Sequence, residues 1–523
     1  MSYKTLIPAI VIIICSFASL NRQFQILQQN SYFITRYLKW FVKSFSLRAV
    51  FSALLLAFSA VCIRMAYTKP LCVLAVLSLF RIAVAFYEHK KSIKKLVFTQ
   101  RVIRMFSASV AVEIALVLTA VFTNGILQAI MLTIAVCLAF MPSVLCLLGL
   151  IVMLPFDKLL CMWFTYDAKQ KLKGVNNLTV IGITGSYGKT STKYILNRIL
   201  SEKYNVLMTP ESFNTPMGIV KTIRERLTPQ TEIFIAEMGA KKPGDIKEIC
   251  KITNPSLGII TSIGPQHLET FKTLENIIDT KFELVDFCQE NSGLCFLNGD
   301  NQHILEKSEN YSSVLYGTDP SLNCFAQNIT YDRNGIAFEI KSGDRCVALH
   351  SRLLGAHNAL NITSAVAVAL HLGISDKDIA YAVSQLTPVD HRLQMKPYIN
   401  GSILIDDAYN ANPAGCLEAV NVLSSFEGMK KIIVTPGLVE LGEREYECNY
   451  ALGQKAGENC DVIILVGKKR AIPIANGVKA TDFDTKKLYI ADSFATAVKI
   501  FSPLCDKNTV ILFENDLPDN YLT

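Results

Sequence analysis

The chain has 523 residues, which is enough for about three domains. Half of the residues are apolar (51%) and the mean hydropathy is +0.31, values that indicate that part of the chain lies in lipid. The formal net charge of +8 does not require a nucleic-acid partner, because much of the basic excess lies in short loops beside apolar segments, and we expect no such partner. Fifteen cysteines occur without a CxxC pair, which argues against a zinc ribbon and favours reduced thiols in a cytosolic enzyme.

Apolar runs fill the first third of the chain, at residues 6–20, 49–67, 71–86, 105–123 and 126–155. The first four are near the roughly 20 residues that a membrane-spanning helix needs. The fifth run is longer and contains Pro142, so it is either one kinked helix or two segments. Basic residues gather in the loops after the first and third runs, which predicts five spans in the cell membrane and a cytoplasmic chain after Pro155. A cleaved signal peptide is the alternative interpretation of the first run.

Residues 179–200, TVIGITGSYGKTSTKYILNRIL, have the order strand, glycine-containing turn, helix. Gly185 and Gly188 follow a β-branched run, and Lys189 and Thr190 open an amphipathic segment. Backbone N–H groups and the helix dipole attract a phosphate at such a helix start. Lys189 can reach the β- and γ-phosphates of ATP, and the Thr190 hydroxyl can take a Mg²⁺ ligand position. A glycine-rich turn that only precedes an ordinary helix is the alternative interpretation.

Short apolar strands alternate with helical periodicities after residue 179, which predicts a mainly parallel α/β sheet. We expect strands at residues 233–236, 257–261, 294–297, 403–405, 431–434, 462–466 and 509–513. Helical stretches at 361–372 and 376–386 lead to a junction at 387–392, after which a second α/β unit follows. The predicted domains are an N-terminal transmembrane helix bundle (1–172), a P-loop ATP-binding α/β domain (173–389) and a C-terminal Rossmann-like α/β domain (390–523).

Glu237 follows the strand predicted at 233–236, and His267 follows the strand predicted at 257–261. Open α/β sheets bind ligands at such strand ends. A carboxylate and an imidazole there could hold Mg²⁺ ions that bridge ATP to a substrate. Each residue alone also fits a surface group or a helix cap, but the phosphate loop nearby favours the magnesium site.

Several motifs, in order along the chain, resemble the Mur ligases, a family of ATP-dependent enzymes that add amino acids during peptidoglycan precursor synthesis. The resemblance covers about residues 174–500 and is greatest to the branch that adds D-alanyl-D-alanine to UDP-N-acetylmuramoyl-tripeptide. The motifs are TGSYGKTS, FNTPMG, AEMGAKKPGDI, HLETF, DTKFEL, LNGDN, LLGAHNALNITSA, DHRLQ, IDDAYNANP and GLVELGE.

The resemblance implies that one group of residues binds ATP: Gly185, Ser186, Gly188, Lys189, Thr190, Ser191, Asn358, Asn361, Arg392 and Asp407. Within this group, Arg392 would come from the hinge to stabilise the transferred phosphate, and Asp407 would hold the ribose. Asn214 and Thr215 would lie close to the reacting phosphate, and Tyr409, Asn410 and Asn412 complete a motif. The catalytic set would be Lys189, Lys281, Arg392 and Asn214.

The same resemblance implies that four residues form the magnesium site: Thr190, Glu237, His267 and, if carbamylated, Lys281. Lys281 matches a lysine that is carbamylated in many family members, where the added carboxylate supports a second Mg²⁺. A bare lysine there would instead put a positive charge beside the γ-phosphate.

The reaction that the resemblance implies is acyl activation. A carboxylate attacks the γ-phosphorus to give an acyl phosphate and ADP, and an amine then displaces phosphate. The expected partners are a peptide-bearing cell-wall precursor, UDP-linked or lipid-linked, an amino acid or D-Ala-D-Ala, and the lipid bilayer.

Two departures from the family bear on the substrates. A membrane bundle stands where family members begin with a soluble domain for the UDP-sugar, and the C-terminal end reads LFENDLPDNY where the related branch usually has a Lys-Gly-Ser-Arg loop. The alternative functions are a Mur-like ligase for another cell-envelope peptide or polymer, and a P-loop membrane transporter or signalling NTPase. A catalytically silent scaffold is disfavoured because no carried-over phosphate or magnesium residue is missing.

Overall fold

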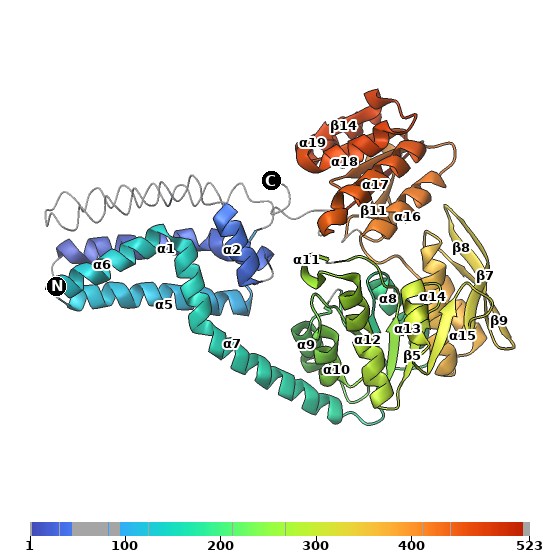
Figure 1. Cartoon of the computed structure of the whole chain (residues 1–523), viewed down its shortest axis with the longest axis horizontal. Coiled ribbons are helices and arrows are strands. Elements are labelled where there is room, and N and C mark those ends of the chain that lie inside the picture. Colours follow the sequence, from blue (N-terminus) through green and yellow to red (C-terminus); the bar gives the residue numbers. More distant parts are fainter. Residues whose placement is uncertain are drawn as a thin grey trace. The chain divides into compact units, whose positions relative to one another are not determined.

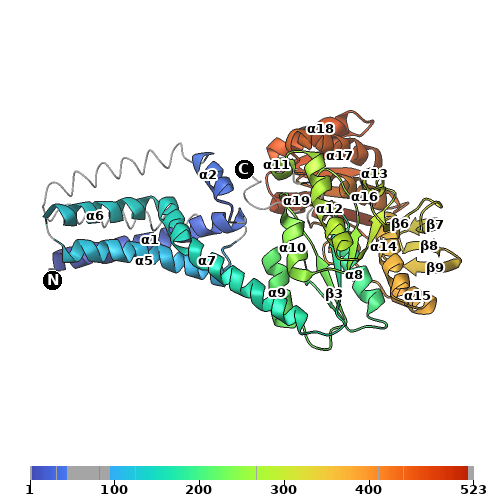
Figure 2. The same cartoon turned by 60° about the horizontal axis from the view of Figure 1, so that its bottom comes forward.

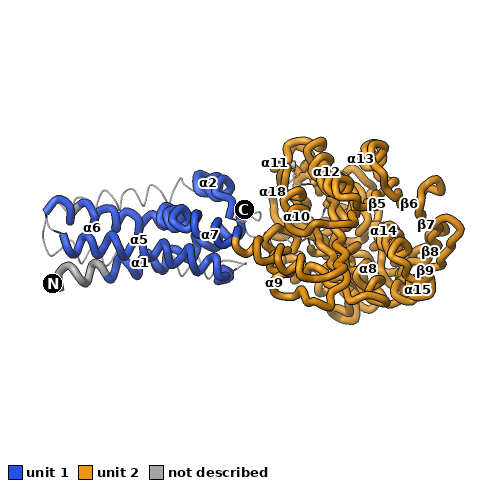
Figure 3. The backbone as a smooth tube through the Cα atoms, turned by 90° about the horizontal axis from the view of Figure 1, so that it is seen from below, with its two compact units in different colours: residues 1–162, 518–523 blue, residues 163–517 orange. Residues whose placement is uncertain are grey.

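The computed structural model describes residues 3–30, 32–43, 82, 95–123, 125–211, 213–266, 268–409, 412–439 and 441–515. The chain forms two compact units, residues 1–162 with 518–523 and residues 163–517 (Figure 3). The apolar runs at 49–67 and 71–86 lie outside the described residues, apart from Ile82, as do His267 and Asn410. The division into three domains stays a prediction.

The described part of the first unit is helical. Its helices are α1 (Tyr3–Gln29), α2 (Ile34–Lys43), α5 (Gln100–Phe122), α6 (Gly125–Phe140) and α7 (Pro142–Lys173), and α7 continues into the second unit. Within the described residues, three segments are long and apolar enough to cross a membrane: Ile10–Gln29, Gln100–Phe122 and Pro142–Lys173. The run at 126–155 is divided between two helices, because Pro142 begins α7 and a proline is well suited to a first helical position. The number of spans stays a prediction.

Polar contacts inside the first unit join helices that are distant in the sequence. Arg104 and Arg101 of α5 both bind Asp157 of α7, with an Nη2–Oδ1 distance of 2.8 Å and an Nε–Oδ2 distance of 3.2 Å. The buried Glu113 of α5 accepts a hydrogen bond at 3.2 Å from the Ser16 hydroxyl of α1. These contacts join α5 to both α1 and α7.

The first sheet of the second unit has nine strands in the order β2-β3-β1-β4-β5-β6-β7-β8-β9. Figure 1 labels four of these strands, β5, β7, β8 and β9. Neighbours from β2 to β7 are parallel, whereas β8 is antiparallel to both β7 and β9. The predicted parallel sheet therefore ends in two antiparallel hairpins. The strands are β1 (Thr179–Thr184), β2 (Val206–Met208), β3 (Ile233–Glu237), β4 (Leu257–Ile260), β5 (Leu294–Asn298), β6 (Ser313–Gly317), β7 (Cys324–Asp332), β8 (Gly335–Ser342) and β9 (Arg345–Ser351).

Helices cover both faces of this sheet (Figure 2). One apolar core joins it to α8 (Lys189–Leu200), α14 (His357–His371) and α15 (Asp376–Ser384). The other core joins it to α9 (Pro216–Arg226), α10 (Asp245–Thr253) and α12 (Leu274–Glu290), and the short helices α11 (Leu268–Phe271) and α13 (Gln302–Ser308) lie along the same stretch of chain. The end of α7 also packs here, because Asp167 binds Nε of Arg224 in α9 at 2.6 Å.

The second sheet of this unit has six strands in the order β10-β11-β15-β12-β13-β14, and only β10 runs antiparallel to its neighbour. The strands are β10 (Gln394–Pro397), β11 (Ile403–Asp407), β12 (Lys430–Thr435), β13 (Val462–Val466), β14 (Leu488–Ala491) and β15 (Thr509–Glu514). The helices α16 (Pro413–Ser424), α17 (Glu445–Asn459) and α18 (Lys468–Lys479) pack on one face, and α19 (Phe494–Phe501) packs on the other. Every strand predicted from the sequence is confirmed within a few residues at its ends.

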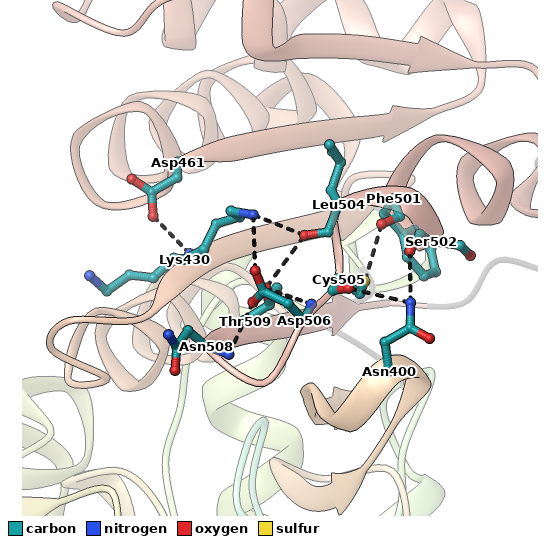
Figure 4. A network of polar contacts seen from close by, with 11 residues as sticks. Asn400, Lys430, Asp461, Phe501, Ser502, Leu504, Cys505, Asp506, Asn508 and Thr509 are labelled. Atoms are coloured by element: carbon teal, nitrogen blue, oxygen red, sulfur yellow. Dashed lines mark hydrogen bonds and ion pairs between the residues drawn. The ribbon is translucent and has the colours of Figure 1, made fainter.

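A polar network holds the turn that leads into β15 (Figure 4). Lys430 donates from Nζ to the Leu504 carbonyl at 3.0 Å and lies 3.8 Å from the Asp506 carboxylate. Asp506 in turn accepts hydrogen bonds from the Thr509 hydroxyl at 2.7 Å and the Asn508 N–H at 3.0 Å. This network connects the start of β15 to its neighbour β12.

Candidate functional site

The phosphate loop lies between the end of β1 and the start of α8. Gly185 and Gly188 have φ angles of +147° and +80°, which favour glycine. A Cβ on Gly185 would overlap the Thr261 hydroxyl, and one on Gly188 would lie 2.6 Å from the Asn361 amide oxygen. Both glycines are therefore required by backbone conformation and by close neighbours, as the sequence motif predicts.

Contacts with the chain after β4 hold the loop in place. Ser186 donates its N–H to the Ser262 carbonyl at 2.6 Å and its hydroxyl to the Gly264 carbonyl at 3.0 Å. The Tyr187 hydroxyl donates to the Pro265 carbonyl at 3.2 Å. These hydrogen bonds fix the conformation of the loop. Less conformational entropy is therefore lost when a phosphate binds there.

Lys189 is the first residue of α8, and its ammonium group points back into the loop. Nζ donates to the carbonyl of Gly185 at 2.6 Å and to that of Ser186 at 3.2 Å. Burial lowers the pKa of Lys189 to about 8, with repulsion from Arg392 acting in the same direction and attraction to Glu237 opposing it. A bound anion would offset the positive charge of Lys189 and favour its ammonium form, so the loop is suited to binding a phosphate.

Glu237, the last residue of β3, is the centre of a buried cluster. Its Oε1 accepts hydrogen bonds from the Thr190 hydroxyl at 3.1 Å and from the Asn214 amide at 3.0 Å, and its Oε2 lies 2.9 Å from Nζ of Lys193. Burial alone would raise the pKa of Glu237, but Lys193, Lys189 and the Asn214 hydrogen bond outweigh it and lower the pKa below its usual value. Glu237 is therefore a carboxylate.

Lys193 is a member of this cluster that our sequence analysis missed. Its side chain is 0% exposed, and it also donates to the Glu211 carbonyl. A signal was present, because Lys193 lies one helical turn after Lys189 and on the same stripe as the buried Leu196 and Leu200. A lysine on an apolar helix stripe needs a buried partner, and Glu237 provides it.

Lys281 of α12 is buried, with 3% of its surface exposed. Burial lowers its pKa well below the usual value, repulsion from Lys189 lowers it further, and Asp245 and Glu283 oppose both effects. Its surroundings therefore favour the neutral amine, which is the form that reacts with CO₂.

A cavity of about 420 Å³ opens beside the loop, a volume typical of small-molecule sites. Asn361 donates to the Asn358 side-chain oxygen at 3.1 Å, and Asn358 donates to the Leu354 carbonyl at 2.8 Å, which fixes the orientation of both amides. The predicted site residues among those that line the cavity are Gly188, Ser191, Asn358, Asn361, Arg392, Asp407 and Asn412.

The junction residues enter this cavity from the side of the second sheet. The Arg392 guanidinium lies 5.3 Å from the centre of the Tyr409 ring. Asp407, the last residue of β11, accepts a hydrogen bond at 3.1 Å from the Leu393 N–H. Asn412 and Thr215 cap helices, with their side-chain oxygens accepting from Gly415 N at 2.9 Å and Gly218 N at 3.3 Å. Helix capping is thus sufficient to explain these two residues.

The donor set suits magnesium. Mg²⁺ prefers oxygen ligands and keeps several waters, and the Thr190 hydroxyl and the Glu237 carboxylate are oxygen groups of this kind that lie 3.1 Å apart. Among the described residues there is no group of three or more His, Cys, Asp or Glu side chains that could hold a metal ion. His267 lies outside those residues.

Comparisons with known proteins show the family to which the chain belongs. The family model for the Mur ligase middle domain matches residues 183–369, and the model for the Mur ligase, glutamate ligase domain matches residues 391–514. UDP-N-acetylmuramoyl-tripeptide--D-alanyl-D-alanine ligase of Bacillus subtilis is 30% identical over 315 residues, which cover 59% of this chain and 67% of that protein.

Solved structures similar to this chain include ligases of the same family. MurF ligase from Thermotoga maritima in complex with ADP has a TM-score of 0.61 and 27% identity, and the match covers 68% of this chain and 80% of that chain. MurF from Acinetobacter baumannii has a TM-score of 0.61 and 25% identity, with coverage of 68% and 77%.

The fold and the site define an ATP-dependent ligase that joins an acid to an amino acid and uses ATP and Mg²⁺. The chain belongs to the Mur ligase family, whose members act in peptidoglycan synthesis, and its relatives named here are D-alanyl-D-alanine-adding ligases.

Proposed function

We propose that this protein activates the carboxylate of a peptide-bearing cell-wall precursor and joins it to an amino acid or to D-Ala-D-Ala. The observation that supports the proposal most is the buried cluster of Lys189, Thr190 and Glu237, next in the chain to the cavity-lining Gly188 and Ser191. It combines a cation with oxygen groups of the kind that bind phosphate and Mg²⁺. Positioning and charge stabilisation dominate in phosphoryl transfer, and these residues supply both.

The proposed nucleotide contacts divide between the two sheets. The loop from Gly185 to Ser191 binds the phosphates, Asn358 and Asn361 belong to the nucleotide pocket, and Asp407 accepts from the ribose hydroxyls. Arg392 stabilises the transferred phosphoryl group together with Lys189. Bound Mg²⁺, held by Thr190, Glu237 and His267, supplies neutralisation of phosphate charge. Asn214, hydrogen-bonded to Glu237, orients that carboxylate near the reacting phosphate.

We propose further that Lys281 is carbamylated. Its neutral Nζ attacks the carbon of CO₂, a C–N bond forms, one C=O electron pair moves to oxygen, and the displaced proton goes to water. The burial of Lys281 and its repulsion by Lys189 support this, because both keep the amine neutral. The resulting carbamate carries a negative charge that offsets Lys189.

The protein is proposed to be anchored in the cell membrane with residues 163–517 on the cytoplasmic side, where ATP is available. Support comes from the three long apolar helices and from α2, which combines Arg36, Lys39 and Lys43 with exposed Leu38 and Val42. Basic amphipathic helices of this kind lie at membrane surfaces. The precursor is then presented at that surface, on a lipid carrier instead of a soluble UDP-sugar.

One screen tests the reaction. Full-length protein in detergent is supplied with ATP, Mg²⁺, UDP-linked or lipid-linked peptide, and single amino acids or D-Ala-D-Ala, and products are identified by mass. Ligation that needs an added amine supports the proposal. ATP hydrolysis that is indifferent to every amine favours a transporter or signalling NTPase, and efficient use of the UDP-linked peptide alone rejects the lipid-linked substrate.

A further inference from the structure

Glu514 is the last residue of β15 and belongs to the LFENDLPDNY segment, the part of the C-terminal end that departs from the family. Its side chain is completely buried. β15 pairs in parallel with β11, and the pairing sets Glu514 directly beside Asp407. The thiol of Cys416, from α16, donates to Oε1 of Glu514 at 2.7 Å. An acidic residue is therefore built into the sheet next to a cavity-lining carboxyl group.

Two carboxyl groups side by side on neighbouring strands, one of them completely buried, cannot both carry a charge at low cost. Burial raises the pKa of Glu514 well above its usual value, and the adjacent Asp407 raises it further. Burial also raises the pKa of Asp407, but the Leu393 N–H, Arg392 and His357 favour its ionised form. Both pKa values are raised, but that of Glu514 is raised well above its usual value, and these surroundings place the shared proton on Glu514 and the charge on Asp407.

The hydrogen bonds agree with this assignment. Oε1 of Glu514 accepts from the Cys416 thiol, as the carbonyl oxygen of a carboxylic acid does. Oε2 is completely buried and forms no hydrogen bond of good geometry to any described residue, although Asp407 lies beside it. An O–H on Oε2 directed at Asp407 would satisfy both groups. Asp407 would then be held from two sides, by that O–H and by the Leu393 N–H.

We propose that Glu514 is a neutral carboxylic acid whose Oε2–H hydrogen-bonds to Asp407 and so positions the Asp407 carboxylate to accept from the hydroxyl groups of the nucleotide sugar. Glu514 is thus a positioning residue, not a catalytic one. The inference deepens the proposed nucleotide site and rests on it. Since Leu393 directly follows Arg392, the same hydrogen bonds also fix the main chain beside the arginine.

The test uses full-length protein in detergent and the variants E514Q and E514L. Glutamine keeps a neutral donor and an acceptor of the same shape, whereas leucine keeps only the volume. We expect E514Q to bind Mg²⁺·ADP, measured by calorimetry, with nearly the affinity of the unaltered protein. E514L should bind about tenfold more weakly, as expected for the loss of one hydrogen bond to a charged group.

Two further measurements separate positioning from a merely structural role. The deficit of E514L should disappear with 2′,3′-dideoxyadenosine diphosphate, which lacks the hydroxyl groups that Asp407 would bind. The infrared difference spectrum between the unaltered protein and E514Q at neutral pH should contain the carbonyl band of one protonated carboxylic acid. An E514L deficit of equal size for both nucleotides, or a carboxylate band in place of the acid band, would overturn the proposal.

The variant K189A shows whether a negative result rejects only the role of Glu514 or the proposed nucleotide site as a whole. If K189A binds Mg²⁺·ADP as well as the unaltered protein does, the proposed nucleotide site is wrong. If K189A loses ADP while E514L and E514Q bind alike, the site stands and only the role of Glu514 is rejected.

Discussion

Replacing Lys193 by methionine should destabilise the second unit strongly. The Lys193 ammonium group is completely buried and lies 2.9 Å from Glu237, whose side chain is 1% exposed. Methionine fills most of the same volume without the charge, so K193M leaves a buried carboxylate that has lost its nearest cation. Removing one partner of a buried ion pair costs about 3–5 kcal/mol.

The lower end of that range applies here, because Thr190 and Asn214 still donate hydrogen bonds to Glu237. A loss of about 3 kcal/mol lowers the melting temperature of the second unit, residues 163–517, by about 4 °C, since its unfolding entropy is about 2.1 cal/mol/K per residue. Differential scanning calorimetry of the full chain in detergent measures the shift. K247M is the matched control, since the Lys247 side chain is exposed and its substitution should leave the melting temperature almost unchanged.

The pH dependence of the stability loss in K193M shows whether the unpaired Glu237 carboxylate causes it. The lowered pKa of Glu237 means that its carboxylate adds stability above the pKa of the unfolded chain, and this stability is lost as the pH falls through the folded pKa. K193M removes the strongest attraction to that carboxylate, so the deficit should be largest near pH 7 and shrink in acid. The double variant K193M/E237L should recover much of the lost stability. A deficit that is constant with pH, or a double variant as unstable as K193M, would refute the reasoning.

Three further predictions concern the site and the membrane. K189A should weaken Mg²⁺·ADP binding by about a hundredfold in calorimetry, because Lys189 is the cation nearest to the loop carbonyls, and unchanged affinity would contradict this. Ligase activity should require CO₂ and should fall as the pH is lowered through the folded pKa of Lys281, because protonation removes the reactive amine, whereas K281A should be inactive with or without CO₂. The protein should stay with membranes through an alkaline carbonate wash, because its helices include three of spanning length, and release into the soluble fraction would contradict membrane insertion.

The order of strand, loop and helix at residues 179–200 could be predicted because each part has a local cause. The β-branched run favours a strand, two glycines are needed for positive φ, and the apolar stripe of α8 repeats at helical spacing. The parallel strands that follow are continuous apolar runs, which are easily recognised. The local signals and the tertiary fold agree there, so sequence reasoning is sufficient.

The antiparallel strands β7 to β9 were missed because they lie at the edge of the sheet and carry many polar residues. The Asn334-Gly335 dipeptide at the first hairpin, whose turn residues are Arg333 and Asn334, and the Gly343-Asp344 turn of the second hairpin were the available signals. Glu514 and Cys416 were also missed, for a different reason. They are 98 positions apart in the sequence, and only the pairing of β15 with β11 and the packing of α16 bring them to Asp407. Which residues act on substrates stays a prediction.

The two low-pKa lysines of the site imply an order of loading. Lys189 and Lys281 repel one another, and this repulsion helps to keep Lys281 free of a proton while the phosphate loop is empty. Nucleotide phosphates bound in the loop would add negative charge near Lys189 and raise both pKa values. If Lys281 captures CO₂ as proposed, its amine would then become an ammonium ion that cannot react. We therefore expect the enzyme to react with CO₂ before it binds ATP. Protein given nucleotide first should show a lag that incubation with bicarbonate beforehand abolishes.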